Sequence, residues 1–187
     1  GYMFAKKVGH VVQEPYPSLV PFEIEEEFIK NLQGLSLKNV ELKILDENKK
    51  IYYKEMGEML FTHFGISGPL VLSASGYISD KMENNKFKAV IDLKPALDYE
   101  ILDKRILKDF KENINRNFNH SLDKLLPKKI IPVIISLSGI YPYKKVNEIT
   151  KEERENLILS IKRLSMTITK TRGFHEAIIT KGGVSVK

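Results

Sequence analysis

The fold is decided around residues 60–69, which read LFTHFGISGP. The first two of these residues are typical of a buried strand, and Gly65 permits the backbone angles of a tight turn. Ser67 can accept hydrogen bonds from the N–H groups that open a helix, so we expect it to be an N-cap. Pro69 then falls in the first helical turn, where its missing N–H costs nothing. The stretch predicts a strand, a turn and a helix over residues 67–82.

The same stretch carries the first candidates for chemistry. His63 is the candidate for acid–base catalysis, with Thr62 beside it, because imidazole titrates near neutral pH. The alternative is that its ring only hydrogen-bonds the backbone of the turn. Ser67 as a nucleophile would require a G-x-S-x-G turn, which GISGP does not match, so capping is the preferred interpretation. No metal site is expected, because the other histidines show no metal-ligand spacing: His10, His120 and His175.

The composition is that of an ordinary globular domain. The 187 residues are 42% hydrophobic and 29% charged, and they include no Cys, which excludes disulfides and Cys-ligated metals. The net charge of +6 is spread along the chain, which favours a solvated surface. The alternative is a non-enzymatic basic module that binds nucleic acid or an acidic partner. No apolar run is long enough to cross a membrane, and a cytoplasmic location is expected.

The order of local patterns predicts a sheet that is interrupted by helices. Short apolar or alternating runs in residues 11–95 indicate strands, and strand-like runs return after residue 165. Residues 96–164 show helical spacing, with short helices at 121–126 and 128–137, and Thr150-Lys151-Glu152-Glu153 matches a capping box. The predicted fold is therefore α+β: a small, mostly antiparallel β-barrel with an inserted small helical bundle. The predicted subdomains are residues 1–95 plus 165–187 for the barrel and 96–164 for the bundle.

Two adjacent glycines near the end of the chain form a candidate cofactor contact. Gly182 and Gly183 follow a strand-like run and would let a backbone approach a phosphate or a flavin ring closely. A β-bulge or a strand-end turn explains the pair equally well. G-x-G-x-x-G and Walker-type loops are both absent, so we expect no dinucleotide to be held by this sequence alone.

Four stretches together resemble a family of bacterial FAD-dependent oxidoreductases. That family includes aminoacetone oxidase-like and bile-acid dehydro-reductase-like flavoproteins. The decapeptide at residues 60–69 carries the most specific resemblance. The others occur in the same order: Gly1-Tyr2 with Ala5 and Gly9-His10, then Pro15 to Pro21, then Gly173-Phe174 with Ala177 through Val184. The helical region is similar in character only.

The resemblance implies a specific place for this chain in a larger enzyme. It would be an insert between two halves of a Rossmann-type FAD domain, in a parent enzyme that moves hydride between a nicotinamide cofactor (NAD(P)), a flavin and a substrate or oxygen. FAD is then expected in the full-length parent and not in this fragment, which would be inactive alone. The partners would be that FAD domain and a small-molecule substrate, with no nucleic acid and no membrane. Gly182, Gly183, Thr62 and His63 would face the flavin or the substrate.

Two other functions compete with this one. The first is the basic binding module for nucleic acid or an acidic partner, which rests on the charge of +6. The second is an independent hydrolase that uses Ser67 and His63, against which the spacing of the serine turn argues.

Overall fold

The centre of the molecule is a closed six-stranded barrel, in a computed structural model that describes residues 1–186. Its strands follow the order β2-β5-β4-β3-β6-β7, and every neighbouring pair is antiparallel. The strands are β2 (Phe22–Ile24), β3 (Ser36–Asp46), β4 (Ile51–Phe61), β5 (Gly65–Ser67), β6 (Phe87–Asp92) and β7 (Leu164–Thr171). The predicted α+β class with a small antiparallel barrel is confirmed.

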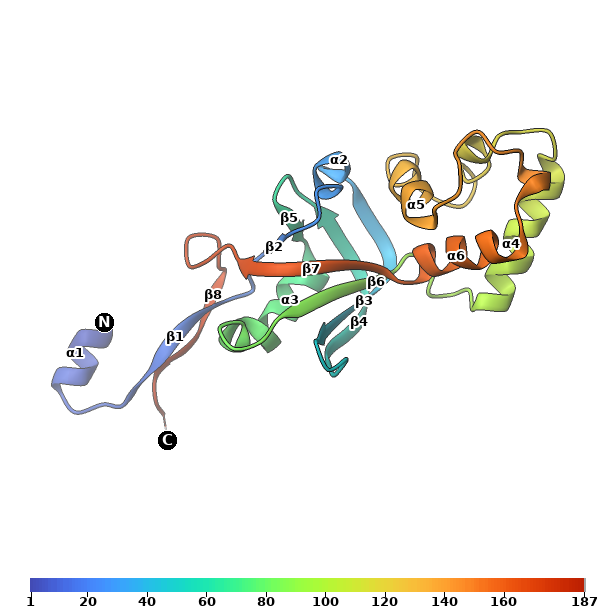
Figure 1. The fold of residues 1–187 in the computed structure, drawn as a ribbon. Helices are drawn as coiled ribbons and strands as arrows, with labels where there is room; N and C mark the ends of the chain where they lie inside the picture. The colour runs from blue at the N-terminus through green and yellow to red at the C-terminus, as the bar shows by residue number, and fades with distance from the viewer. Residues whose placement is uncertain (187) are drawn as a thin grey trace.

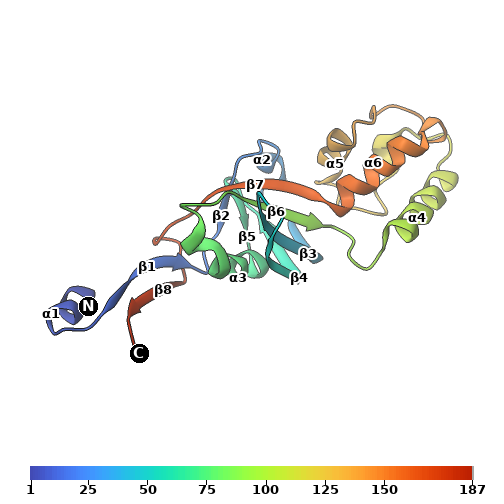
Figure 2. The same cartoon turned by 60° about the horizontal axis from the view of Figure 1, so that its bottom comes forward.

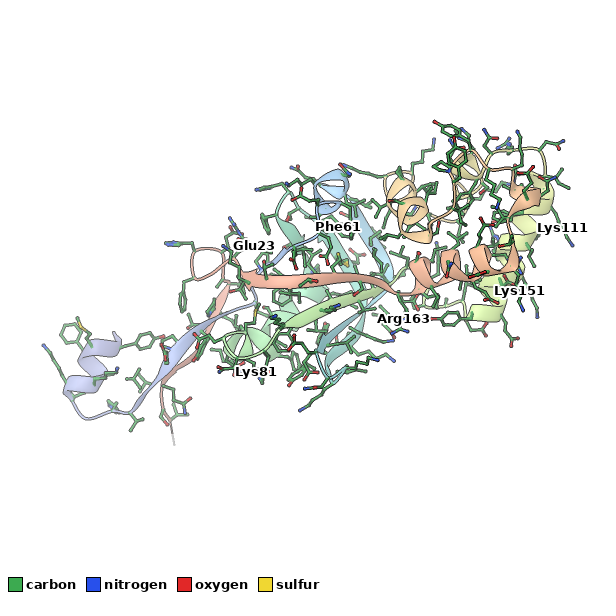
Figure 3. All side chains as sticks on the ribbon, viewed as in Figure 1. Glu23, Phe61, Lys81, Lys111, Lys151 and Arg163 are labelled. Carbon is green, nitrogen blue, oxygen red and sulfur yellow. The ribbon has the colours of Figure 1, made fainter. Side chains whose placement is uncertain are left out.

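The interior of the barrel is built by alternation along its strands. In β3, Val40, Leu42 and Ile44 are buried while the residues between them face outward, because side chains of a strand alternate between the two faces. Phe61, at the end of β4, is fully buried within the barrel (Figure 3). The short helix α2 (Ile29–Leu32) adds Ile29 and Leu32 to this core.

Residues 60–69 form the predicted strand and helix, but Ser67 is not the helix cap. Ser67 is the last residue of β5 and pairs with Leu60, so its backbone belongs to the barrel. Gly68, with a φ of 93°, holds the N-cap position of α3 (Pro69–Ile78), and no side chain caps that helix. Pro69 does lie in the first turn, as predicted. The helix ends at Ile78 and a single 3-10 turn, η1 (Ser79–Lys81), follows it.

Gly65 is required for close packing of strands rather than for the turn that the sequence predicted. It lies in β5, between β2 and β4, and the left-handed glycines are at other positions. A Cβ atom at Gly65 would lie 2.2 Å from the carbonyl oxygen of Phe22. Only glycine therefore lets β2 approach β5 at this distance.

The chain between β6 and β7 is helical and lies on one side of the barrel (Figures 1 and 2). Its helices are α4 (Tyr99–Glu112), η2 (Phe118–His120), α5 (Ile131–Ser138), η3 (Val146–Glu148) and α6 (Lys151–Lys162). The predicted capping box is confirmed: the Glu153 N–H donates to Thr150 Oγ1 at 3.2 Å, and the Thr150 N–H donates to Glu153 Oε2 at 2.7 Å.

Two predicted helix bounds in this region are wrong. Residues 121–126 form turns and not a helix. The N–H groups of Leu125 and Leu126 both donate to Leu122 O, and Pro127, which lacks an N–H, follows before a regular helix can propagate. The helix expected from Lys128 begins at Ile131 instead, with a proline in its first turn.

A buried lysine joins the helices to the barrel where the chain leaves β6 and returns into β7. Lys162 Nζ lies 2.6 Å from Asp92 Oδ2, and the two side chains are 7% and 14% exposed. The same ammonium donates to the carbonyl oxygens of Lys94 and Leu97, at 3.0 and 2.5 Å. The Leu93 N–H donates to Ile161 O at 3.0 Å, so a main-chain bond also links the two crossings.

The first and last strands pair with each other outside the barrel. β1 (Val12–Ser18) and β8 (Ile179–Val184) form an antiparallel ribbon, and α1 (Tyr2–Lys7) lies at its far end. Both figures show this ribbon leaving the barrel on the side opposite to α4, α5 and α6 (Figures 1 and 2). The division into subdomains at residues 96 and 164 stays a prediction.

Replacing Gly65 by Ala should lower the free energy of unfolding by about 2 kcal/mol, because the new methyl group must displace the β2 backbone. Ser67→Ala is the matched control in the same strand. It should change stability by less than about 0.5 kcal/mol, because Ser67 caps no helix. Urea unfolding measures both variants, and a larger loss for Ser67→Ala than for Gly65→Ala would contradict this account.

Replacing Lys162 by Met should cost about 3 kcal/mol, because it leaves Asp92 as a buried carboxylate without its cation. Lys151→Met in the same helix is the control. Lys151 pairs at 3.7 Å with Glu155 in an exposed site, so its loss should cost less than about 0.5 kcal/mol. Thermal and urea unfolding of the two variants would refute the assignment if their losses were equal.

Candidate functional site

The turn that holds His63 is fixed by its own backbone. The Thr62 N–H donates to Gly65 O at 2.8 Å, and the Gly65 N–H donates to Thr62 Oγ1 at 3.1 Å. His63 is exposed, and its ring contacts the Phe64 ring edge-on with centroids 5.0 Å apart. Among residues 1–186, no hydrogen bond or ion pair joins the His63 side chain to Ser67 or to a carboxylate. The catalytic role of His63 stays a prediction.

A charged cluster lies beside this turn, and we call it the barrel-end cluster: Glu23, Phe64, Lys170, Arg172 and Glu176. The Arg172 guanidinium lies 4.4 Å from the centre of the Phe64 ring. It donates to Glu23 Oε1 at 2.8 Å and to Glu176 Oε1 at 2.7 Å. Lys170 Nζ lies 3.4 Å from the second Glu23 oxygen. Figure 3 places Glu23 where the barrel meets the ribbon.

The cluster shifts the proton affinities of its charged groups. Partial burial by itself would raise the pKa of Glu23, but the hydrogen bonds and charges of Arg172 and Lys170 together lower it below its ordinary value. Hydrogen bonds to Glu176 and Glu23 raise the pKa of Arg172 further. The ion network therefore links β2 and β7 to Glu176, in the segment between β7 and β8.

Gly182 and Gly183 both have positive φ angles, 94° and 101°. A Cβ at Gly182 would lie 2.4 Å from Glu14 O, at the bulge where the β1–β8 register shifts between Gln13 and Tyr16. A Cβ at Gly183 would lie 3.2 Å from the Tyr2 ring. Both glycines thus have a packing role within the ribbon, and their contact with a flavin stays a prediction. Gly182 and Gly183 contact β1 and α1, whereas Thr62 and His63 contact residues of the β4–β5 turn. The predicted site residues thus fall into two separate sets of contacts.

The ribbon and α1 expose an unusual amount of apolar surface. No residue of α1 is buried, and Met3 and Phe4 are 77% and 73% exposed. We call this region the ribbon end, and its exposed apolar side chains are Tyr2, Met3, Phe4, Val8, Val11, Ile178, Ile179 and Val184. Exposed apolar side chains gathered on two elements in this way are typical of an interface.

A groove of about 780 Å³ lies on the outer face of the barrel, beside the junction with the helices. Glu41, Lys88, Tyr99 and Arg163 are among its lining residues. Burial alone would raise the pKa of Glu41, but Lys43 at 2.8 Å and Lys54 at 3.5 Å lower it. Figure 3 shows Arg163 at this junction, where α6 meets β7.

Sequence reasoning missed both the barrel-end cluster and the groove. Glu23 and Arg172 are 149 positions apart in the sequence, and only closure of the barrel brings them together. Within residues 1–186, no group of three or more His, Cys, Asp or Glu side chains is arranged to hold a metal ion. No helix in the same part of the chain is long and apolar enough to span a bilayer.

Comparison with known proteins identifies a matching family. A profile of the family described as "HI0933-like protein barrel and H2TH domain" matches residues 16–179. That range contains all six barrel strands and every helix from α2 to α6.

Three curated proteins are similar to the chain over nearly its whole length. It is 33% identical over 191 residues to the ribosomal RNA dihydrouridine synthase of Haemophilus influenzae, covering 100% of this chain and 43% of that protein. It is 28% identical over 184 residues to the protein of the same name from Escherichia coli, covering 98% and 43%. It is 26% identical over 197 residues to the 3-dehydro-bile acid delta(4,6)-reductase of Clostridium scindens, covering 98% and 45%. The chain thus spans less than half the length of these relatives.

Replacing Glu23 by Gln should destabilise the fold by about 0.5–1 kcal/mol at pH 7. The folded pKa of Glu23 lies below the unfolded value of about 4.3, so the contribution is complete above that value and is lost as the pH falls through the folded pKa. The difference from the unmodified chain should therefore shrink below about pH 4. Urea unfolding across pH measures it, with Glu58→Gln, from an exposed 3.9 Å pair, as the control. A difference that grows in acid would contradict the ion network.

Proposed function

The chain belongs to the HI0933-like barrel and H2TH domain family, and from that membership we propose that it is the insert domain of an FAD-dependent oxidoreductase. The observation that carries the proposal is the match of residues 16–179, together with coverage of only 43–45% of each relative. The remaining length of such a protein has room for a Rossmann-type FAD domain.

The described residues do not fit an FAD site by themselves. The sequence has no G-x-G-x-x-G loop, Gly182 packs on the β1 backbone and Gly183 lies under the Tyr2 ring. The proposal therefore places the cofactor on the FAD domain. The ribbon end would contact that domain, because its apolar side chains are exposed in the described part of the chain, Met3 and Phe4 most of all.

The relatives' names support one class of reaction. Formation of dihydrouridine saturates a carbon–carbon double bond conjugated to a carbonyl, and a delta(4,6)-reductase of a 3-dehydro-bile acid acts on a bond of the same kind. We therefore propose that the parent enzyme adds hydride and a proton to such a bond, with a nicotinamide cofactor as the source of the hydride. The barrel would shape the substrate side of the flavin, and the helices would limit access.

Contact with nucleic acid is the second candidate function. Two of the three relatives carry a name that specifies ribosomal RNA. This candidate differs from the sequence-based expectation of a small-molecule substrate and no nucleic acid. It is compatible with the first, because an RNA base can be the group that the flavoenzyme reduces.

The ribbon end provides the test of the FAD-domain contact. In the longer protein, the double variant Met3→Lys and Phe4→Lys should lose most of its bound flavin, because two charges would enter an apolar interface. The measurement is flavin absorbance per molecule of purified protein. Leu137→Lys with Leu159→Lys, on exposed positions of the helices, is the control and should retain flavin.

Two outcomes would refute the proposal. One is equal flavin loss in both double variants. The other is a 187-residue chain that purifies with flavin near one per molecule, because the cofactor would then need no second domain.

A further inference from the structure

The helical region carries most of the chain's net positive charge. Residues 96–164 contain 14 Lys and Arg against 10 Asp and Glu, which is a net +4 of the chain's +6. Five of those acids pair with a cation of the same region: Asp103, Asp109, Glu112, Glu153 and Glu155. Eight cations there have no acidic partner among the described residues: Lys104, Lys108, Lys111, Arg116, Lys128, Lys129, Lys145 and Arg163. The helical region therefore presents cations that are free to bind an anion.

Two segments of this region are tied together by main-chain bonds. The Val146 N–H donates to Arg116 O at 3.2 Å, and the Phe118 N–H donates to Lys144 O at 2.9 Å. An isolated antiparallel bridge joins Asn117 to Lys145. These bonds place two exposed cations, Arg116 and Lys145, on adjacent strands of backbone. Lys145 Nζ donates to the carbonyl oxygen of Asn115 at 3.1 Å, and no carboxylate within residues 1–186 pairs with it.

Two exposed tyrosines lie on the segment that also carries Lys145. Tyr141 is 65% exposed and Tyr143 is 61% exposed, and their ring centroids are 5.6 Å apart at an interplanar angle of 62°. The Asn119 N–H donates to Pro142 O at 2.9 Å, so the backbone between the two rings is held in place. Both rings therefore remain mostly exposed to solvent. We call four side chains the tyrosine patch: Arg116, Tyr141, Tyr143 and Lys145.

We infer that the tyrosine patch is a contact surface for single-stranded RNA. The main-chain bonds hold the two cations and the two rings on the same pair of short backbone segments. Exposed rings and cations are the combination that binds single strands, because each base can stack on a ring while the cations hold phosphates. RNA binding by the patch is argued from the patch itself. Only its biological purpose, to hold the RNA whose uridine is reduced, depends on the proposed function. The helical region that carries the patch lies on the side of the barrel opposite to β1, β8 and α1 (Figure 1), so RNA and an FAD domain would not compete for one surface.

The groove beside the junction is less suited to an RNA strand. Its carboxylates already hold lysines, since Glu41 pairs with Lys43 and Lys54 and Asp92 pairs with Lys162. Lys49 and Lys88 also line the groove, and neither forms an ion pair with a carboxylate in the described part of the chain. Replacing both therefore serves as a matched control for loss of charge.

The experiment measures binding of a fluorescein-labelled single-stranded RNA of about 12 nucleotides to the 187-residue chain by fluorescence anisotropy. At about 50 mM salt, where phosphate contacts are strongest, the unmodified chain should bind. The variant Tyr141→Ala with Tyr143→Ala should bind about 10-fold more weakly or worse, and Tyr141→Phe with Tyr143→Phe should bind like the unmodified chain.

The cations are tested by salt dependence. Arg116→Gln with Lys145→Gln should reduce the slope of log affinity against log salt by about 1.4, the value for two phosphates of a single strand. Lys49→Gln with Lys88→Gln removes the same charge from the groove and should leave the slope unchanged. Thermal unfolding of each variant shows whether it is folded. If Tyr141→Ala with Tyr143→Ala does not fold, Arg116→Gln with Lys145→Gln still tests the patch.

Four results would overturn the inference. They are no binding at low salt, unchanged affinity of the alanine pair, an equal effect of the groove lysines, and tighter binding of duplex RNA than of the single strand. The RNA-binding measurement uses the chain without flavin. Its outcome can therefore be interpreted even if the proposed contact with an FAD domain is wrong.

Discussion

One buried cation holds the helices to the barrel, and the rest of the arrangement depends on it. Lys162 satisfies Asp92 and two main-chain carbonyls at the point where the chain leaves and re-enters the barrel. A buried ammonium is tolerated only when each of its donors has a partner, so the geometry around it is narrowly defined. The bond between Leu93 and Ile161 adds a second link at the same point. The orientation of α4 and α6, and with it the shape of the groove, follows from this junction.

The molecule has two surfaces of different chemistry on opposite sides of the barrel. The ribbon end is apolar, and its glycines allow α1 and β1 to pack closely on β8. The helical side carries unpaired cations and two uncovered tyrosine rings. The closed barrel lies between the two surfaces, and its closure leaves its own six strands without a free edge.

Local sequence signals were reliable where a few neighbouring residues decide the outcome. Proline in the first turn of α3 and the capping box at Thr150 were predicted correctly, because both depend on groups within four positions. The cap predicted at Ser67 was wrong, because pairing with Leu60 in the barrel takes that residue into a strand. The same competition explains Gly65, whose role is set by the carbonyl oxygen of Phe22 and not by a turn.

The sequence by itself determined the α+β class, the placement of a helical region between two strand-rich regions, and a resemblance strong enough to indicate the family. Alternation, helical spacing and short motifs are properties of neighbouring residues, so they can be identified before the fold is known. Tertiary structure alone decided the barrel-end cluster, the junction at Lys162 and the pairing that exposes Tyr141 and Tyr143. Those sites join residues far apart in the chain or depend on which surfaces remain uncovered. Closure of the barrel and packing of the helices decide which distant residues meet and which side chains stay exposed.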